Sequence, residues 1–147
     1  MLTRMMTASR WLRIAAVIMA LFAAGHTMGG RKAWSPVGET LVLEQMRTFQ
    51  FDAMGTSRTY LDFYLGFGFV ISVLQFMQAV LLWQVGGLAR EDARRVRPLI
   101  ATFLVAAIAS TLVTWRYIFL VPTIFSIVYT VAVALAFVMA GRARTAD

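Results

Sequence analysis

Residues 61–85 read LDFYLGFGFVISVLQFMQAVLLWQV, an apolar run with a single charged residue, Asp62, in its first turn. About 20 apolar residues in succession are enough for a helix to cross the hydrocarbon core of a bilayer. A helix satisfies all its backbone hydrogen bonds internally, which lipid cannot do for an isolated extended segment. This run therefore predicts a transmembrane helix.

Three further apolar runs have a similar length, and they cover residues 11–30, 98–118 and 122–140. The first run also fits a secretory signal peptide, because basic residues precede it and small residues at 23–25 offer a cleavage site. Its length favours a membrane span instead. Gly141 follows the last run as a residue that ends a helix. The four runs predict an all-α integral membrane protein, a four-transmembrane-helix bundle that forms one domain over residues 1–147.

The composition indicates that lipid is the solvent for much of the chain. Of the 147 residues, 60% are hydrophobic and 14% are charged, and the mean hydropathy is +0.72, which is unlike a soluble domain. The net charge of +7 comes from basic residues scattered between apolar runs, so it indicates membrane orientation and no nucleic-acid partner. With no cysteine and one histidine, His26, the chain lacks thiolate nucleophiles, Cys-ligated metals and paired imidazoles. We expect no metal and no cofactor.

The basic residues also set the expected orientation. Most of the 14 lysines and arginines lie in the N-terminal tail and span edge, in the loop between the second and third spans, and in the C-terminal tail. Short cytoplasmic loops of membrane proteins carry an excess of Lys and Arg. We therefore expect both termini to be cytoplasmic, with the first and third loops on the outer face.

The first loop, residues 31–58, contains a further helical pattern. The apolar residues of this pattern, spaced as on one helix face, are Val42, Met46, Phe49 and Ala53. They predict an amphipathic helix on the outer surface, which ends at Gly55 and in which Glu44 pairs with Arg47. Such a helix is either a lid over the ends of the spans or a gate or docking surface for a partner.

Small and polar residues mark the faces on which the spans are expected to pack in lipid. On the third span they recur at every fourth residue, and on the fourth span at a similar spacing: Thr102, Ala106, Ser110 and Thr114, then Ser126, Thr130 and Ala134. On the second span, Gln75 and Gln78 share a face with Tyr64 and Gly68. The two amides either join helices by hydrogen bonds or form the polar wall of a ligand pocket, and both interpretations place them inside the bundle.

His26 lies four residues before the end of the first span, which is about 6 Å below the membrane boundary at the helical rise per residue. An ionisable residue at that depth is a candidate functional residue. It is either a proton carrier or a neutral imidazole that bridges two helices through hydrogen bonds.

Asp62 has a structural explanation of its own. Thr59 precedes it by three residues at the start of an apolar run, which is a variant of the capping box. The carboxylate would then accept a free backbone N–H at the positive end of the helix dipole. The other interpretation makes Asp62 an acid that works with His26.

The topology places six candidate residues near one membrane level, namely His26, Trp34, Arg58, Asp62, Tyr64 and Arg116. This convergence predicts an outer-leaflet pocket. Arg58 or Arg116 would meet an anionic or carbonyl group, and Trp34 with Tyr64 would pack on an apolar body. Gln75 and Gln78 complete the expected ligand-binding set, and His26 with Asp62 is the expected acid/base pair.

The chain also resembles a known group of sequences. The pattern Gly25-His26-Thr27 late in the first span, followed by DFYLGFG at 62–68, is similar to an uncharacterised family of small bacterial inner-membrane proteins. The resemblance implies a multi-pass protein of the bacterial inner membrane, and it implies no particular activity.

Together these features lead us to expect a protein that binds a lipid, an isoprenoid or a quinone, with acid/base isomerase- or cyclase-like chemistry left open. One alternative is a non-catalytic accessory or assembly subunit of a membrane complex. A second alternative is the protomer of an oligomeric small transporter. The expected partners are membrane lipids, an apolar ligand, and another membrane protein or a second copy of the chain.

Overall fold

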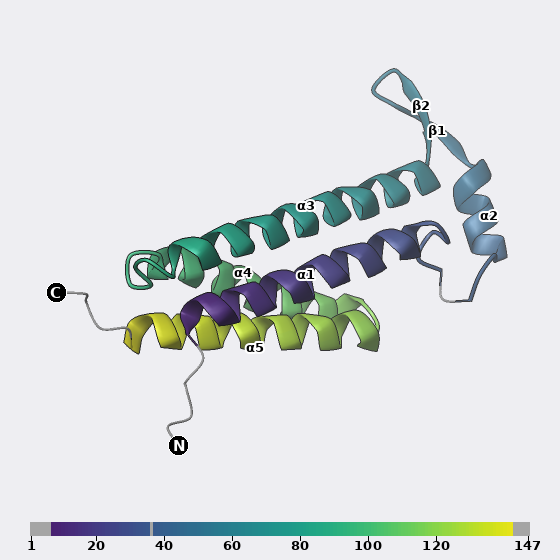
Figure 1. Cartoon of the computed structure of the whole chain (residues 1–147). Helices are drawn as coiled ribbons and strands as arrows, with labels where there is room; N and C mark the ends of the chain where they lie inside the picture. The colour runs from purple at the N-terminus through teal and green to yellow at the C-terminus, as the bar shows by residue number, and fades with distance from the viewer. Residues whose placement is uncertain (1–6, 36, 143–147) are drawn as a thin grey trace. The chain divides into compact units, whose positions relative to one another are not determined.

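The computed structural model of the chain describes residues 7–35 and 37–142. The described residues form five helices and one β-hairpin (Figure 1), in the order α1 (Ala8–Gly30), α2 (Leu41–Thr48), β1 (Gln50–Ala53), β2 (Thr56–Thr59), α3 (Tyr60–Leu88), α4 (Arg97–Tyr117) and α5 (Leu120–Arg142). Four of them, α1, α3, α4 and α5, are long and apolar enough to cross a membrane. The four predicted spans are therefore confirmed as helices. α1, α3 and α5 extend a few residues beyond at least one expected end, whereas α4 begins and ends one residue earlier than expected. Gly141 lies within the last turn of α5, so the prediction that it follows the helix is wrong.

The chain divides into two compact units. Unit 1 comprises Met1–Phe22 and Phe76–Asp147, and unit 2 comprises Ala23–Gln75. α1 and α3 each contribute one part to each unit, while α4 and α5 belong to unit 1, and α2 and the hairpin belong to unit 2.

Unit 1 has a core of small and branched apolar side chains. α4 and α5 follow one another through a short connection and lie side by side. The largest side chains that are fully buried are Leu12, Leu82, Ile100 and Val133, one from each of the four long helices. Between α4 and α5, the hydroxyl of Thr111 lies 2.9 Å from that of Thr130 and donates to that of Ser126 (3.2 Å). These contacts confirm the small polar face that was predicted on the last span.

The face predicted for packing on α4 is wrong. Thr102, Ala106 and Ser110 are exposed, whereas Ile100 and Ala107 are buried. In lipid the exposed face of a helix is also apolar, so spacing alone does not distinguish it from the packed face. The hydroxyl of Thr102 bonds to the Pro98 carbonyl of its own helix (3.2 Å), and this removes its need for a partner on another helix.

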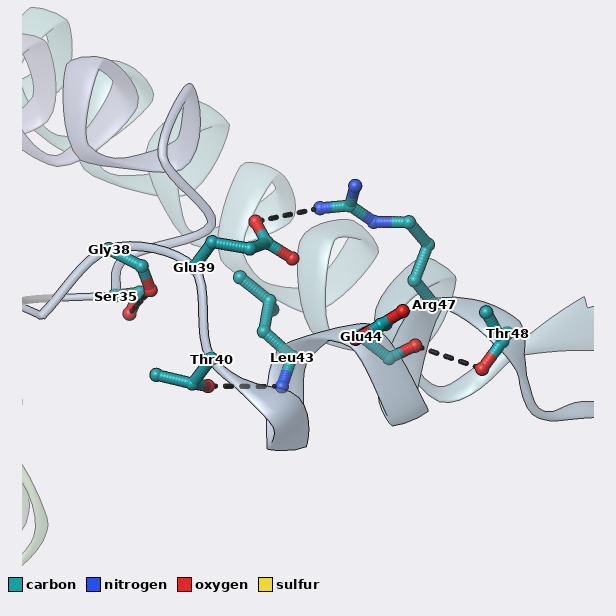
Figure 2. Close-up of polar contacts among 8 residues, drawn as sticks. All are labelled: Ser35, Gly38, Glu39, Thr40, Leu43, Glu44, Arg47 and Thr48. Atoms are coloured by element: carbon teal, nitrogen blue, oxygen red, sulfur yellow. Dashed lines mark hydrogen bonds and ion pairs between the residues drawn. The ribbon is translucent and has the colours of Figure 1, made fainter.

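In unit 2, α2 begins with a side-chain cap. The hydroxyl of Thr40 accepts the backbone N–H of Leu43 (3.2 Å), and Leu43 is the buried residue of this helix. Figure 2 shows that Arg47 reaches back to Glu39, with 3.2 Å between its Nη2 and Oε2 of the carboxylate. The predicted pair of Arg47 with Glu44 is therefore wrong, because a carboxylate just before the helix is the nearer partner.

The amphipathic helix of the first loop is shorter than predicted. α2 ends at Thr48, and residues 50–59 form the hairpin of β1 and β2, in which Ala53 pairs with Thr56. The two residues of the turn have positive φ angles, 56° at Met54 and 84° at Gly55, and this is the geometry of a two-residue turn that matches strand twist. The Asp52 carboxylate accepts the Gly55 N–H (2.7 Å) and closes the turn. The prediction that the helix ends at Gly55 is therefore wrong, because Gly55 forms the hairpin turn.

Candidate functional site

The single histidine joins two helices within unit 2. Nδ1 of His26, on α1, lies 3.0 Å from the hydroxyl oxygen of Ser72, on α3. Ser72 is buried, and its hydroxyl also lies 3.3 Å from the Gly68 carbonyl. This confirms the interpretation of His26 as a bridge between helices. Its role as a proton carrier stays a prediction.

Nε2, the other imidazole nitrogen of His26, has no hydrogen-bond partner among the described residues. Within the described residues, the hydrogen bond of the His26 side chain is the one through Nδ1, and His26 is partly exposed. A neutral imidazole has one N–H donor and one acceptor nitrogen, so fixing Nδ1 also sets what Nε2 offers. In the described part of the chain, Nε2 is therefore free to meet a ligand.

Trp34 closes the end of α1 over this histidine. The N–H of Trp34 donates to the Gly29 carbonyl and that of Ala33 donates to the Gly30 carbonyl, both at 3.0 Å. With a left-handed φ of 48° at Ala33, this pair of bonds is a Schellman motif, which folds the chain back onto its own helix. The indole Nε1 then donates to the His26 carbonyl (2.8 Å).

The Trp34 ring fits against three glycines. A Cβ atom built on Gly68 would lie 2.1 Å from Cη2 of Trp34. A Cβ on Gly30 would lie 2.8 Å from Cζ2, and one on Gly29 would lie 2.9 Å from Cδ1 of the same ring. All three distances are shorter than van der Waals contact, so the indole occupies space that any other residue type at these positions would fill.

Aromatic rings surround the indole. Its centroid lies 5.0 Å from the His26 ring, 5.3 Å from the Phe69 ring and 5.8 Å from the Tyr64 ring, and the Tyr64 contact is edge-on. Tyr64 and Phe69 remain 42% and 41% exposed. The cluster of His26, Trp34, Tyr64, Phe69 and Ser72, here called the histidine cluster, therefore has an apolar outer surface next to one imidazole nitrogen.

Asp62 caps α3. The Thr59 N–H donates to the Asp62 carboxylate (2.8 Å), and the Asp62 N–H donates to the Thr59 hydroxyl (3.1 Å). This reciprocal pair is the predicted capping box. The hydrogen bonds of Asp62 thus go to Thr59 and those of His26 go to Ser72, and the proposed acid/base pairing of the two is untested.

Arg58 lies on β2, where it pairs with Phe51 across the hairpin, and its side chain is exposed. Nη1 donates to the carbonyl of Ser57, its chain neighbour (2.9 Å). Arg116 belongs to the other unit, at the end of α4, with its guanidinium carbon 5.2 Å from the centroid of the Tyr117 ring. Both arginines keep donors available for an anion.

The two glutamines of α3 differ in their contacts. Nε2 of Gln78 donates to the Tyr129 hydroxyl (2.8 Å) within unit 1, so this amide joins α3 to α5 as one of the two interpretations expects. Oε1 of Gln75 is buried and has no hydrogen-bond partner among the described residues. Gln75 belongs to unit 2, on the helix turn that follows Ser72.

Sequence reasoning missed Ser72, Phe69 and the glycines that hold Trp34. Ser72 sits in the middle of an apolar run, and its spacing from Gly68 and Gln75 places it on the polar face of α3. That spacing was a usable signal for Ser72. The fit of Gly68 to the indole depends on how α1 and α3 are aligned, and the sequence does not encode it locally.

Two shallow, open hollows lie on the surface of the described residues, and neither is lined by the histidine cluster. One is lined by residues of the hairpin, from Gln50 to Ser57, and the other by residues from Gln84 to Glu91 at the end of α3. Within the part of the chain that the structure describes, no three His, Asp or Glu side chains gather to hold a metal ion.

Comparison with known proteins found no relative of this chain. A scan against protein-family models, a search of the curated proteins and a search of the solved structures each gave no match to this chain.

Proposed function

We propose that this chain is a multi-pass protein of the bacterial inner membrane that binds an apolar or amphipathic molecule at the histidine cluster. The ligand is of the lipid, isoprenoid or quinone type. The observation that carries the proposal is the state of His26, whose Nδ1 is fixed by Ser72 while Nε2 has no partner within the described chain.

The chemistry of the cluster suits a molecule with one polar group and an apolar body. Nε2 of His26 would bond to a carbonyl or hydroxyl of the ligand, as donor or acceptor according to the tautomer. The exposed parts of Tyr64 and Phe69 would pack on the apolar part. Such a site, one oriented polar group among aromatic rings, is typical of sites for apolar ligands.

The distribution of arginine supports the orientation of this site. Basic residues concentrate before α1, between α3 and α4, and after α5. This distribution supports a topology with both termini in the cytoplasm and the histidine cluster at the outer leaflet.

Catalysis in this proposal depends on His26 alone. An imidazole near neutral pH is a suitable proton carrier for an isomerisation or a cyclisation. Asp62 is less suited to the partner role, because its carboxylate accepts the N–H that begins α3.

Extraction of the purified protein tests the proposal. The wild-type chain, solubilised in mild detergent, is extracted with organic solvent and the extract is analysed by mass spectrometry. We expect one apolar species to be enriched over the bulk membrane lipids. His26→Phe, which keeps a ring but has no ring nitrogen, should retain about five- to tenfold less of it, which corresponds to one lost hydrogen bond.

Thr27→Ala is the matched control, because the Thr27 hydroxyl bonds within its own helix to the Ala23 carbonyl (2.7 Å). It should retain the species at the wild-type level. Equal retention by wild type and His26→Phe would contradict the proposal.

A second candidate function, that of an accessory subunit, is favoured by an exposed aromatic surface on unit 2. Its rings form a series of contacts 4.8–6.1 Å apart between the hairpin and the start of α3, made by Phe49, Phe51, Tyr60, Phe63 and Phe67. Phe67 is 67% exposed. If the chain is an accessory subunit, it should co-purify with a larger membrane protein, lose that protein in Phe67→Ser and keep it in His26→Phe.

A further inference from the structure

Arginines gather at one end of unit 1. The Ser9 hydroxyl donates to the Gly86 carbonyl (2.5 Å), so the start of α1 lies beside the end of α3. The guanidinium carbon of Arg97 lies 4.2 Å from the centroid of the Phe137 ring, so the start of α4 lies beside the end of α5. The arginines of this end include Arg13, Arg90, Arg94, Arg95, Arg97 and Arg142.

The described residues give these arginines no carboxylate partner. The ion pair found in the described chain joins Arg47 to Glu39, in unit 2. The carboxylate of Asp92, in the loop before α4, accepts the backbone N–H groups of Arg94 and Arg95 (3.0 and 3.1 Å). Within the described residues, this end of unit 1 therefore carries a net positive charge that an anion could balance.

Arg13 lies against an aromatic ring and a glycine of α3. Its guanidinium carbon lies 4.8 Å from the centroid of the Trp83 ring, and a Cβ built on Gly86 would lie 3.2 Å from its Cγ. Its Nε is buried and has no hydrogen-bond partner in the described part of the chain. A buried guanidinium N–H without an acceptor is costly, and the planar fork of arginine matches the oxygens of a phosphate.

The surroundings of Arg13 indicate that the phosphate is part of a lipid. Arg13 and Trp83 belong to α1 and α3, which are both candidate membrane spans. The Trp83 ring is 50% exposed and offers an apolar surface beside the guanidinium. An arginine held near the end of a span by an aromatic ring meets the headgroup region of the bilayer, where anionic lipids attract basic residues.

We propose that Arg13, held by Trp83 and Gly86, binds the headgroup phosphate of an anionic phospholipid, with the other arginines of this end supplying further positive charge. The site is independent of the histidine cluster, because it lies in unit 1 and uses none of the same residues.

Native mass spectrometry of the full chain, purified in mild detergent and mixed with phosphatidylglycerol or phosphatidylcholine, tests the site. We expect wild type to retain phosphatidylglycerol in preference to phosphatidylcholine. Arg13→Gln should lower the retained phosphatidylglycerol about fivefold, which is the contribution of one arginine at an anionic lipid surface. Arg13→Lys keeps the charge but not the planar fork, and it should restore only part of the loss.

Arg31→Gln is the control for charge, because it removes one exposed arginine of unit 2 and should leave retention unchanged. Equal retention of the two lipids by wild type would overturn the proposal, and so would equal losses in Arg13→Gln and Arg31→Gln. Displacement of phosphatidylglycerol by inorganic phosphate would show a site for free anions and would overturn the assignment to a lipid. If Arg13→Gln fails to fold, two measurements on wild type test the proposal. They are its preference for phosphatidylglycerol over phosphatidylcholine and the retention of phosphatidylglycerol in the presence of inorganic phosphate.

Discussion

At the scale of single residues, the contact between Trp34 and Gly68 holds α1 and α3 together beside His26. The indole holds the last turn of α1 through its bond to the His26 carbonyl, and it presses against α3 at Gly68. The sequence left two interpretations of His26 open, a proton carrier or a bridge between helices. The partner, Ser72, depends on the alignment of two spans far apart in sequence, and no local pattern specifies it.

Gly68→Ala tests this fit. The new methyl group would lie 2.1 Å from an indole carbon, so the ring must leave its place. We expect a loss of about 1–3 kcal/mol in the free energy of unfolding, as for other overpacked sites, together with a change in the near-ultraviolet circular dichroism of tryptophan.

Gly66→Ala is the matched control on the same helix. A Cβ there meets no atom within 4 Å, and alanine favours a helix over glycine by about 1 kcal/mol. It should leave stability equal to or above that of wild type. A Gly68→Ala protein as stable as Gly66→Ala would show that the indole does not occupy this position.

At the scale of elements, the first loop shows where periodicity misleads. The apolar residues from Val42 to Ala53 fit one helical stripe, yet the chain leaves the helix after Thr48. The hairpin forms at Met54 and Gly55, whose two positive φ angles suit a two-residue turn. Methionine is not typical of such a turn, so little in the sequence indicated it. The capping box of Thr59 and Asp62 was predicted correctly, because it depends only on residues three apart.

The hairpin turn can be tested by two opposite changes. Gly55→Ala places a side chain at a φ of 84°, which costs roughly 1–2 kcal/mol. Met54→Asn puts at a φ of 56° a residue that tolerates this conformation better. Hydrogen exchange of the backbone amides of residues 50–59 should become about five- to thirtyfold faster in Gly55→Ala, and slower in Met54→Asn. The same exchange rates in both variants would contradict the turn.

Asp62 is tested by its effect on ligand retention. Asp62→Asn keeps an oxygen that can accept the Thr59 N–H, so we expect a folded protein that retains the extracted ligand as wild type does. If a folded Asp62→Asn protein loses the ligand or its catalytic turnover, Asp62 belongs to the functional site.

At the scale of the whole molecule, composition and run length were sufficient to predict four helices that are long and apolar enough to span a membrane. Twenty or so apolar residues have one stable conformation in lipid, and this makes the span the most predictable element of such a chain. The faces on which the spans pack were less predictable, as the exposed Thr102 and Ser110 of α4 show. Packed and lipid-facing surfaces are both apolar, so the sequence distinguishes them weakly.

The central claim is that Nε2 of His26 is the polar contact of a ligand site in a membrane protein. Because the chain has one histidine, protein labelled with ¹⁵N-histidine gives the signals of one imidazole. A panel of a short-chain quinone, an isoprenoid alcohol and a phospholipid is added to the delipidated protein, and the two nitrogen signals are followed by NMR. The account predicts that one class of probe shifts Nε2 saturably, and that Ser72→Ala alters Nδ1 before any probe is added. An Nε2 signal that no probe shifts would contradict the claim.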